Sequence, residues 1–468
     1  MRQCVRTMKA RLPILLLPVL LAACNLGPDY KAPENPTPQA WRNPPEQSAE
    51  LWPSQDWWQG FGSPQLDGYI AAAQSANTDL AAAEARIRQA DAQARIAGAP
   101  LLPSLSLGAD AIHARQPSAR TGQLVTGTTY EPGLTASYEV DFWGKNAATA
   151  RAAEANAQAS RYDQVTVSLT VMTGVATTYF RTLELHDRLK VAEDNLASAR
   201  NTFEGLQKQQ HAGLVNALDV AQQETVVATL DAAVPALRQQ YEQALDSLAI
   251  LLGRTPDQVE RGDETLAGLS HPDVRPGLPS SVLARRPDVA NAEAQLISAN
   301  ANIQAARAAF YPSIDLTAQG GFVSAALSTA LKPSNAVFTL TAGLTQTIFD
   351  NGLLEGQFDL AQGRYDELLA TYRKTVLSAF ANVEDSLVAV QQTADQEKRQ
   401  AQAVATAQRA YDFARAQMKA GTINILTVLN TENSLFSAQD ALVQAKSAHF
   451  QALVNLFGAL GGGWQKEA

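Results

Sequence analysis

An internal duplication is the feature that most constrains how this chain of 468 residues can fold. Six residues of the first half recur in the second at an offset of about 209 positions, which is too long for a solenoid and indicates duplication of a whole structural unit. Further on, AGLVNALDV at 212–220 matches AGTINILTV at 420–428. We therefore expect two similar repeats. The six recurring residues are Asp79, Glu84, Ala90, Ala97, Pro103 and Ser104, which match Asp288, Glu293, Ala299, Ala306, Pro312 and Ser313.

Each repeat carries two segments in which apolar and polar residues alternate, after a helical stretch that reaches Pro103 or Pro312. Alternation with period two predicts strands with one apolar and one polar face. Periodicity alone favours a soluble sheet with one wet face. Because four strands cannot close a barrel around water, insertion into a membrane would need several chains in one barrel. The apolar positions are Leu105, Leu107, Ala109 and Ala111; Leu134, Ala136, Tyr138, Val140 and Phe142; Ile314, Leu316, Ala318 and Phe322; and Phe338, Leu340, Ala342 and Leu344.

Two very long helices are predicted, at 145–211 and 352–420. Both segments lack proline and consist mainly of residues that favour helix. At 1.5 Å per residue, a helix of that length spans roughly 100 Å, which is typical of a coiled coil and not of a globular core. Gly213 and Gly421 follow these segments and mark turns, because glycine adopts a left-handed backbone at least cost. We thus expect a hairpin of long helices in each repeat.

The N-terminus predicts export and lipidation. Four cations precede an apolar run at 12–21 that is too short to span a bilayer, as in a secretory signal. The motif Leu21-Ala22-Ala23-Cys24 resembles a bacterial lipobox, which would make Cys24 the lipid-bearing N-terminus of the mature chain. An ordinary signal peptide with a chance cysteine is the alternative. Once Cys4 is removed, Cys24 has no partner for an intrachain disulfide, and its acyl chains would hold it firmly in a membrane.

Charge and motifs exclude several classes of function. The net charge of −9, which becomes −13 without the signal segment, argues against nucleic acid as a partner. No apolar run after Cys24 is long enough for a membrane helix, so the mature chain could enter a bilayer only as a closed barrel. No phosphate loop, nucleophile elbow or HExxH motif occurs, and we expect no enzyme activity. The histidines show no metal-ligand spacing, so no metal and no cofactor beyond the lipid on Cys24 is expected; they are His113, His186, His211, His271 and His449.

Several blocks together resemble the outer membrane factor family, the TolC-like efflux conduits, and specifically its lipoprotein branch. They are CNLGPDYKAP at 24–33, DWWQGFGSPQL at 56–66 and LARRPDVANAEAQL at 283–296. The last is the most specific, and the resemblance covers nearly all of the chain after Cys24. Asp56, Trp57 and Trp58 could suggest a sugar site, but a structural clasp is the better interpretation.

The resemblance implies an α+β membrane protein that works as a homotrimer. Three chains would close a 12-stranded β-barrel in the outer membrane, continued by a long α-helical barrel with an equatorial domain. It also implies a periplasmic adaptor protein and an inner-membrane resistance-nodulation-division pump as partners, beside outer-membrane lipid. The conduit would passively conduct drugs or toxic small molecules. The alternatives are a type I protein secretion conduit and a structural periplasmic spacer lipoprotein.

The family often closes its periplasmic tip with aspartates, an arginine and a tyrosine beside the glycine turns. Here Asp219 keeps the aspartate of the first repeat, while Met418 and Ile423 stand where the tyrosine and arginine would be. Thr427 and Asn430 replace aspartates of the second repeat. The electrostatic lock is therefore largely missing. We hypothesise a constriction made by apolar packing of Met418 and Ile423 and by one Asp219 carboxylate per chain, although Asp219 could equally be a solvated helix residue.

These expectations divide the chain into six segments. They are a signal peptide at 1–23, a lipid-anchored tether at 24–64, a first structural repeat at 65–255, a linker at 256–278, a second structural repeat at 279–458 and a tail at 459–468.

Overall fold

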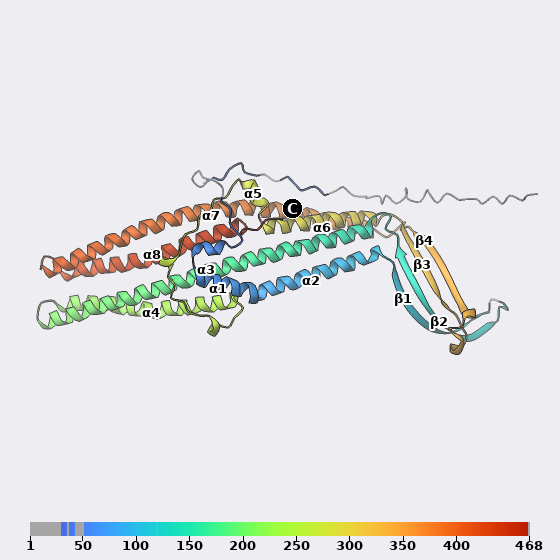
Figure 1. Cartoon of the computed structure of the whole chain (residues 1–468), viewed down its shortest axis with the longest axis horizontal. Coiled ribbons are helices and arrows are strands. Elements are labelled where there is room, and N and C mark those ends of the chain that lie inside the picture. Colours follow the sequence, from blue (N-terminus) through green and yellow to red (C-terminus); the bar gives the residue numbers. More distant parts are fainter. Residues whose placement is uncertain (1–29, 35–36, 43–50, 119, 467–468) are drawn as a thin grey trace, which may run out of the picture. The chain divides into compact units, whose positions relative to one another are not determined.

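The structure is a computed structural model that describes residues 30–34, 37–42, 51–118 and 120–466. Cys24 and the predicted signal peptide lie outside the described residues. The chain divides into two compact units that do not coincide with the sequence repeats, because each unit takes residues from both (Figure 1). The sheet unit comprises Met1–Pro33, Arg88–Ala159 and Glu293–Thr371, and the helical unit comprises Glu34–Ile87, Ser160–Ala292 and Tyr372–Ala468.

The sheet unit holds one antiparallel sheet of four strands in the order β1-β2-β3-β4. Each repeat supplies one hairpin, and the pairing of β2 with β3 joins the two hairpins, with Gly133 opposite Gly321 at one end and Glu139 opposite Asp315 at the other. The four predicted strands are thus confirmed. Their bounds are Ser104–Pro117 for β1, Leu124–Glu139 for β2, Ser313–Phe322 for β3 and Ala336–Thr345 for β4.

The register places the predicted apolar positions of all four strands on one face. Paired residues of an antiparallel sheet lie on the same face, and their neighbours along each strand lie on the other. One apolar row is Leu105, Ala136, Ala318 and Leu340, and the next is Leu107, Leu134, Gly320 and Phe338. The opposite face carries the rows Ser104, Ser137, Thr317 and Thr341, and Ser106, Thr135, Gln319 and Thr339. The sheet therefore has one apolar and one polar face across all four strands, and we call it two-faced.

The second strand ends earlier than its alternation predicts. β2 stops at Glu139, so Val140 and Phe142 lie beyond it. The reason is the start of the next helix: the Asp141 carboxylate accepts hydrogen bonds from the backbone N–H groups of Asn146 and Ala147, at 2.9 and 2.7 Å. Asp141 thus satisfies two of the unpaired amides at that helix N-terminus, which no strand residue could do.

Four helices make up most of the rest of the chain (Figure 1). α3 spans Lys145–His211 and α7 spans Leu353–Lys419, which confirms both predicted long helices to within one residue at each end. α4 (Ala217–Leu251) returns along α3, and α8 (Ile425–Ala459) returns along α7. Each repeat therefore contains the predicted helical hairpin.

Shorter helices precede the strands of each repeat: two come before β1, and two lie between α4 and β3. They are α1 (Pro64–Ala76), α2 (Thr78–Gly98), α5 (Pro279–Leu283) and α6 (Pro287–Ala308). Among the residues that the structure describes, none of the helices combines the length and the apolarity that crossing a membrane requires.

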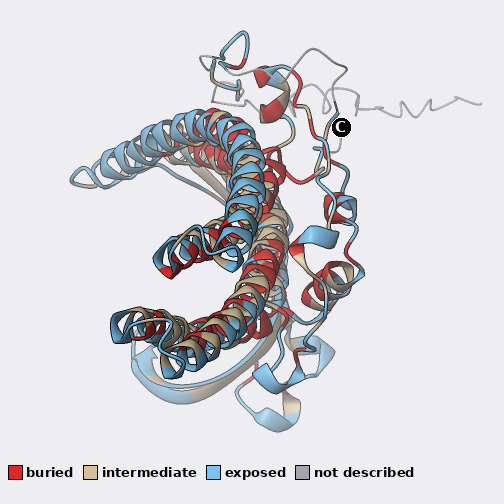
Figure 2. Cartoon of the chain, turned by 90° about the vertical axis from the view of Figure 1, so that its left-hand side faces the viewer, coloured by how far each residue is buried: buried red, intermediate tan, exposed pale blue. Residues whose placement is uncertain are grey.

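The core of the helical unit is an aromatic cluster beside the long helices. Trp57 stacks on Phe457 at 5.0 Å between ring centroids, and Phe61 packs edge-on against Phe180 and Phe450 at 4.9 and 5.9 Å. Phe61, Phe180 and Phe450 are fully buried. Trp57 and its neighbours therefore form part of the core, in agreement with the predicted structural clasp. Elsewhere on the long helices buried residues occupy narrow stripes and much of the surface is exposed (Figure 2).

Buried polar contacts fix the loops around this core. The Tyr179 hydroxyl and the Ser63 hydroxyl both donate to Oε2 of Glu264 at 2.6 Å, which ties the start of α1 and the linker to α3. Arg286 pairs with Asp288 through two hydrogen bonds and donates a third, of 3.0 Å, to the carbonyl of Ala459. The block at 283–296, which contains Arg286 and Asp288, thus binds the end of α8.

Candidate functional site: the hairpin ends and the contacts between the hairpins

The end of the first hairpin is a tight turn set by a glycine. Gly213 has φ 73°, as expected for the predicted turn. Its N–H donates to the carbonyl of Gln210 at 2.9 Å, and the N–H of Leu214 donates to Gln209 at 2.9 Å. This pair of bonds is a Schellman motif, which satisfies the last carbonyls of α3.

Asp219 lies in the first turn of α4, where it completes a capping box. The Asn216 side-chain oxygen accepts from the Asp219 N–H at 3.0 Å, and an Asp219 carboxylate oxygen accepts from the Asn216 N–H at 3.3 Å. Each residue thereby satisfies an amide that the helix leaves unpaired. The Asp219 side chain is half-exposed and, among the described residues, forms no ion pair. It therefore has a local structural role as well as a free charge.

The second hairpin ends in the same way. Gly421 has φ 70°, its N–H donates to Met418 O at 3.0 Å, and the Thr422 N–H donates to Gln417 O at 3.0 Å. The two turns predicted from the repeat are therefore the same motif in both copies.

Thr427 and Asn430 occupy exposed positions at the start of α8. Both the N–H and the hydroxyl of Thr427 donate to the side-chain oxygen of Asn424, at 3.2 and 3.1 Å. Asn424 thus caps α8 as Asn216 caps α4, but the third helical residue is threonine and leaves this end without an acid.

An apolar cluster joins the two hairpins just inside their ends. Met418 and Ile423 are half-buried and pack against it. Its members come from all four long helices, so the apolar residues at the predicted constriction also hold the hairpins of one chain together. The buried members are Leu206, Val220, Tyr411, Ala414, Ile425, Val428, Leu429 and Leu435.

A buried carboxylate lies next to this cluster. Glu432 is 1% exposed, and its Oε1 accepts hydrogen bonds from the hydroxyls of Ser198 and Tyr411, each at 3.0 Å. Its Oε2 has no hydrogen-bond partner among the described residues. Burial, and then the nearby Glu432 carboxylate, raise the pKa of Tyr411, which keeps this hydroxyl protonated as a donor. The trio links α3, α7 and α8.

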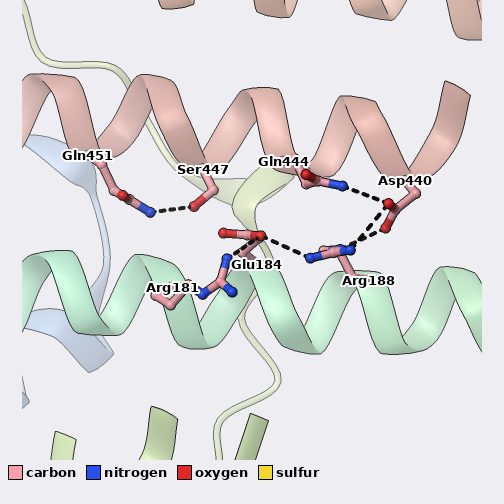
Figure 3. A network of polar contacts seen from close by, with 7 residues as sticks. All are labelled: Arg181, Glu184, Arg188, Asp440, Gln444, Ser447 and Gln451. Carbon is pink, nitrogen blue, oxygen red and sulfur yellow. Dashed lines mark hydrogen bonds and ion pairs between the residues drawn. The ribbon is translucent and has the colours of Figure 1, made fainter. Parts of the chain in front are cut away.

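A charged network joins the hairpins further along (Figure 3). Arg188 of α3 donates from Nε to Oδ1 of Asp440 at 2.7 Å and from Nη2 to Oδ2 at 3.3 Å, so the contact with α8 is bidentate. Glu184, whose side chain is only 5% exposed, contacts Arg188 at 3.5 Å and Arg181 at 2.7 Å. Bidentate, partly buried pairs are the strong class of ion pair.

The sequence analysis did not predict this network. Arg188 and Asp440 lie 252 positions apart on helices of different repeats, and no spacing rule relates such positions. Met418, Ile423, Thr427 and Asn430 carry no charge, so the expectation that the charged lock at the hairpin ends is largely missing stays a prediction. The charged contact between the hairpins is instead made by Arg188 and Asp440.

Comparison with known proteins identifies a family, close relatives and a solved structure that match nearly the whole chain. The profile of the family described as "Outer membrane efflux protein" matches residues 69–254 and 278–462. The chain is 40% identical over 456 residues to the Pseudomonas aeruginosa "Pyoverdine export outer membrane protein OpmQ", covering 96% of each chain. It is 30% identical over 467 residues to the Escherichia coli "Cation efflux system protein CusC", covering 97% of this chain and 100% of CusC. The structure of the Campylobacter jejuni CmeC outer membrane channel superposes with a TM-score of 0.88 at 25% identity, covering 94% of this chain and 96% of CmeC.

Proposed function

The chain belongs to the outer membrane efflux protein family, and we propose that three identical copies of it form the outer-membrane conduit of a tripartite exporter. Membership confirms the resemblance found in the sequence and the predicted fold class of long helices with four strands per chain. The protein is an outer-membrane efflux channel component, which favours the conduit over the structural spacer.

The two-faced sheet is the observation that carries the trimeric assembly. Within the described residues, β1 and β4 each pair on one side only, so the sheet has two open edges. The apolar rows are exposed in the single chain: Leu105 is 69% and Leu340 is 75% accessible. Lipid can cover such a face, but it cannot hydrogen-bond open strand edges, and pairing β1 of one copy with β4 of the next removes them.

Three is the smallest number of copies that leaves a water-filled path. Two copies bring eight strands, and the interior of an eight-stranded barrel is filled by its own side chains. Three copies bring twelve strands, with the serine and threonine rows facing the lumen. A passive route for polar compounds then follows from the sheet alone.

The hairpin ends are the proposed constriction of this conduit. Asp219 contributes one carboxylate per copy at a half-exposed position, beside Met418 and Ile423 and the exposed Thr427 and Asn430. Opening requires the two hairpins of a chain to move, and the Arg188–Asp440 contact opposes that movement.

Cys24 is the proposed lipid anchor of the mature chain. This proposal rests on the lipobox-like motif Leu21-Ala22-Ala23-Cys24 and on the lack of a second cysteine after Cys24 in the sequence. Mass spectrometry of the mature N-terminus should find a cleaved chain that begins with a diacylglyceryl-modified, N-acylated Cys24. An unmodified N-terminus at any other residue rules the anchor out.

Partners supply the energy and the choice of substrate. We propose a periplasmic adaptor protein and an inner-membrane resistance-nodulation-division pump, because a passive channel cannot drive export. OpmQ is named for pyoverdine export and CusC for cation efflux, although both are similar to this chain over nearly their whole length. One channel design thus serves unlike compounds, and we infer that the pump and adaptor select the substrate.

Planar-bilayer recording of the detergent-purified protein tests the conduit. Stepwise conductance, together with heat-resistant trimers on gels, is the expected result. A water-soluble monomer after delipidation would point to the spacer. A deletion strain separates the two export classes: sensitivity to small toxic molecules supports efflux, whereas loss of a secreted protein with unchanged sensitivity supports type I secretion.

A further inference from the structure

Three side chains that can bind a metal converge in the helical unit, away from the hairpin ends. His271 comes from the segment between the two repeats, Glu397 from α7 and His449 from α8. Each offers one ligand atom, and these atoms lie within 4.8 Å of one another. Two of the five histidines therefore meet in space although their spacing in the sequence shows no metal-ligand pattern. Sequence spacing could not reveal this, because the three residues come from three separate segments.

One carboxylate oxygen serves both imidazoles. Oε2 of Glu397 lies 2.8 Å from Nδ1 of His449 and 3.6 Å from Nε2 of His271. A tetrahedral zinc site with bonds of about 2.0–2.1 Å places its ligand atoms roughly 3.3 Å apart. The ion would replace the proton between His449 and Glu397, and that contact would open by about half an ångström. The two imidazole nitrogens, which lie within 4.8 Å of each other, would have to approach to the same spacing of roughly 3.3 Å.

The surrounding core holds the cluster in place. The ring of His271 stacks on His449 and on Phe450, each at 4.4 Å between centroids, with interplanar angles of 17° and 9°. Phe450 is fully buried and belongs to the aromatic core described above. His449 and Glu397 sit on long helices with side chains 12% and 19% exposed. Because the two imidazole planes are nearly parallel, His271 must turn out of the stack before its nitrogen lone pair and that of His449 can point at one ion.

Solvent reaches the cluster at His271. The His271 side chain is 37% exposed, which gives an entering ion a path and leaves room for water as a fourth ligand. Lys446 is a nearby cation, and its charge disfavours a bound metal.

We propose that His271, Glu397 and His449 form a binding site for one divalent first-row transition-metal ion per chain, in the class of Zn²⁺. Two imidazoles and one carboxylate form a donor set that zinc sites with three protein ligands use. The nitrogen ligands exclude Mg²⁺ and Ca²⁺, which take oxygen. Bound there, the ion clamps the segment between the repeats onto the α7–α8 hairpin, independently of what the channel conducts.

Zinc binding to the full-length channel, purified in detergent without a histidine tag, tests this site. Calorimetric titration with Zn²⁺ should give one ion per chain, and Mg²⁺ should give no heat. Glu397→Gln, which keeps the side-chain shape, and His271→Ala, which changes only a partly exposed loop residue, should each weaken binding at least 10-fold. His211→Ala, at an exposed position near the first hairpin end, is the matched control and should bind like the parent.

Substitution with Co²⁺ supplies a second readout that does not depend on stability. The parent and His211→Ala should show the visible absorption of a four-coordinate cobalt site, and His271→Ala should lose it. Absence of stoichiometric Zn²⁺ binding to the parent, or binding that His271→Ala and Glu397→Gln leave unchanged, overturns the proposal. Because these readouts need neither conductance nor export, they stand apart from the test of the conduit.

Discussion

Two glycines, 208 positions apart, end the long helices with the same backbone conformation. An added Cβ at Gly213 or Gly421 would meet nothing within 4 Å. The demand for glycine therefore comes only from the positive φ, and not from packing. The spacing between the repeats was enough to predict both turns, because a left-handed residue after a long helix has a strong sequence signal.

Replacing either glycine should therefore cost backbone strain alone. Gly213→Ala and Gly421→Ala should each destabilise the hairpin end by about 1 kcal/mol, whereas Gly213→Asn should cost less, because asparagine tolerates the left-handed region. Thermal melting of the purified channel by circular dichroism measures the difference. Equal losses for alanine and asparagine would contradict the conformational explanation.

Asp219 combines a capping role with a charge, and two substitutions separate them. Asp219→Gln keeps an acceptor for the Asn216 N–H and removes the charge, while Asp219→Ala removes both. We expect Ala to lower stability by about 0.5 kcal/mol and Gln to leave it nearly unchanged. Both should reduce cation preference in bilayer recordings if the three carboxylates line the constriction.

The control for this prediction lies in the same turn of the other hairpin. Thr427 occupies the corresponding third helical position of α8 and carries no charge. Thr427→Ala should leave cation preference as it is. An Asp219→Ala channel with unchanged conductance and unchanged preference would remove Asp219 from the constriction and leave only its cap.

At the scale of elements, contacts between helices of different repeats decide how firmly the hairpins are held. Arg188 forms a bidentate pair with Asp440 and also contacts Glu184, which is 5% exposed. Removing the arginine leaves a buried carboxylate with Arg181 as its remaining partner among the described residues. Leaving a buried charge short of partners costs more than the pair itself contributes.

Arg188→Ala should therefore destabilise the helical unit by roughly 2–4 kcal/mol and make the channel open more readily. The double-mutant cycle with Asp440→Ala should give a coupling of about 1–3 kcal/mol. The matched control is Arg200 with Asp231, which join α3 to α4 with both side chains more than half exposed and should couple by less than about 1 kcal/mol. Equal couplings for the two pairs would mean that burial does not strengthen the Arg188 contact.

The strands make a prediction of their own, because neighbouring residues of β4 lie on opposite faces. Leu340 belongs to an apolar row and Thr341 to a polar one, and both are exposed in the chain. Leu340→Arg should reduce the heat-resistant trimer, since arginine facing lipid costs about 2–4 kcal/mol near the bilayer centre. Thr341→Arg should assemble normally and shift the channel towards anions. The opposite ranking would reverse the assignment of the faces.

Helices and strands were predictable where a single residue pattern continued without interruption. The helices at Lys145–His211 and Leu353–Lys419 follow from residue preference and the lack of proline, and all four strands follow from alternation. The extent of β1 and β2 was not predictable, because Gly108, Gly127 and Pro132 interrupt the pattern within them. The end of β2 was missed because Asp141 reads as a polar strand position and in fact caps α3.

At the scale of the whole molecule, contacts between distant segments could not be predicted from the sequence. The aromatic core, the Arg188–Asp440 pair and the convergence of His271, Glu397 and His449 each bring together residues from different repeats or from the linker. Duplication fixes the order of elements within each repeat and carries no signal for side chains that meet between repeats. The assembly of several chains was harder still to predict, because within one chain only the unpaired strand edges indicate it.

Disulfide trapping between the sheet edges tests the trimer most directly. Cysteines placed on β1 and on β4, at several pairs around Ser106 and Thr341, should cross-link β1 of one copy to β4 of the next after oxidation in intact outer membranes. The account predicts a ladder of one, two and three chains that stops at three, with single-cysteine variants remaining monomeric on the gel. Cross-links confined to single chains, or a ladder that runs past three, would contradict a closed barrel built from three sheets.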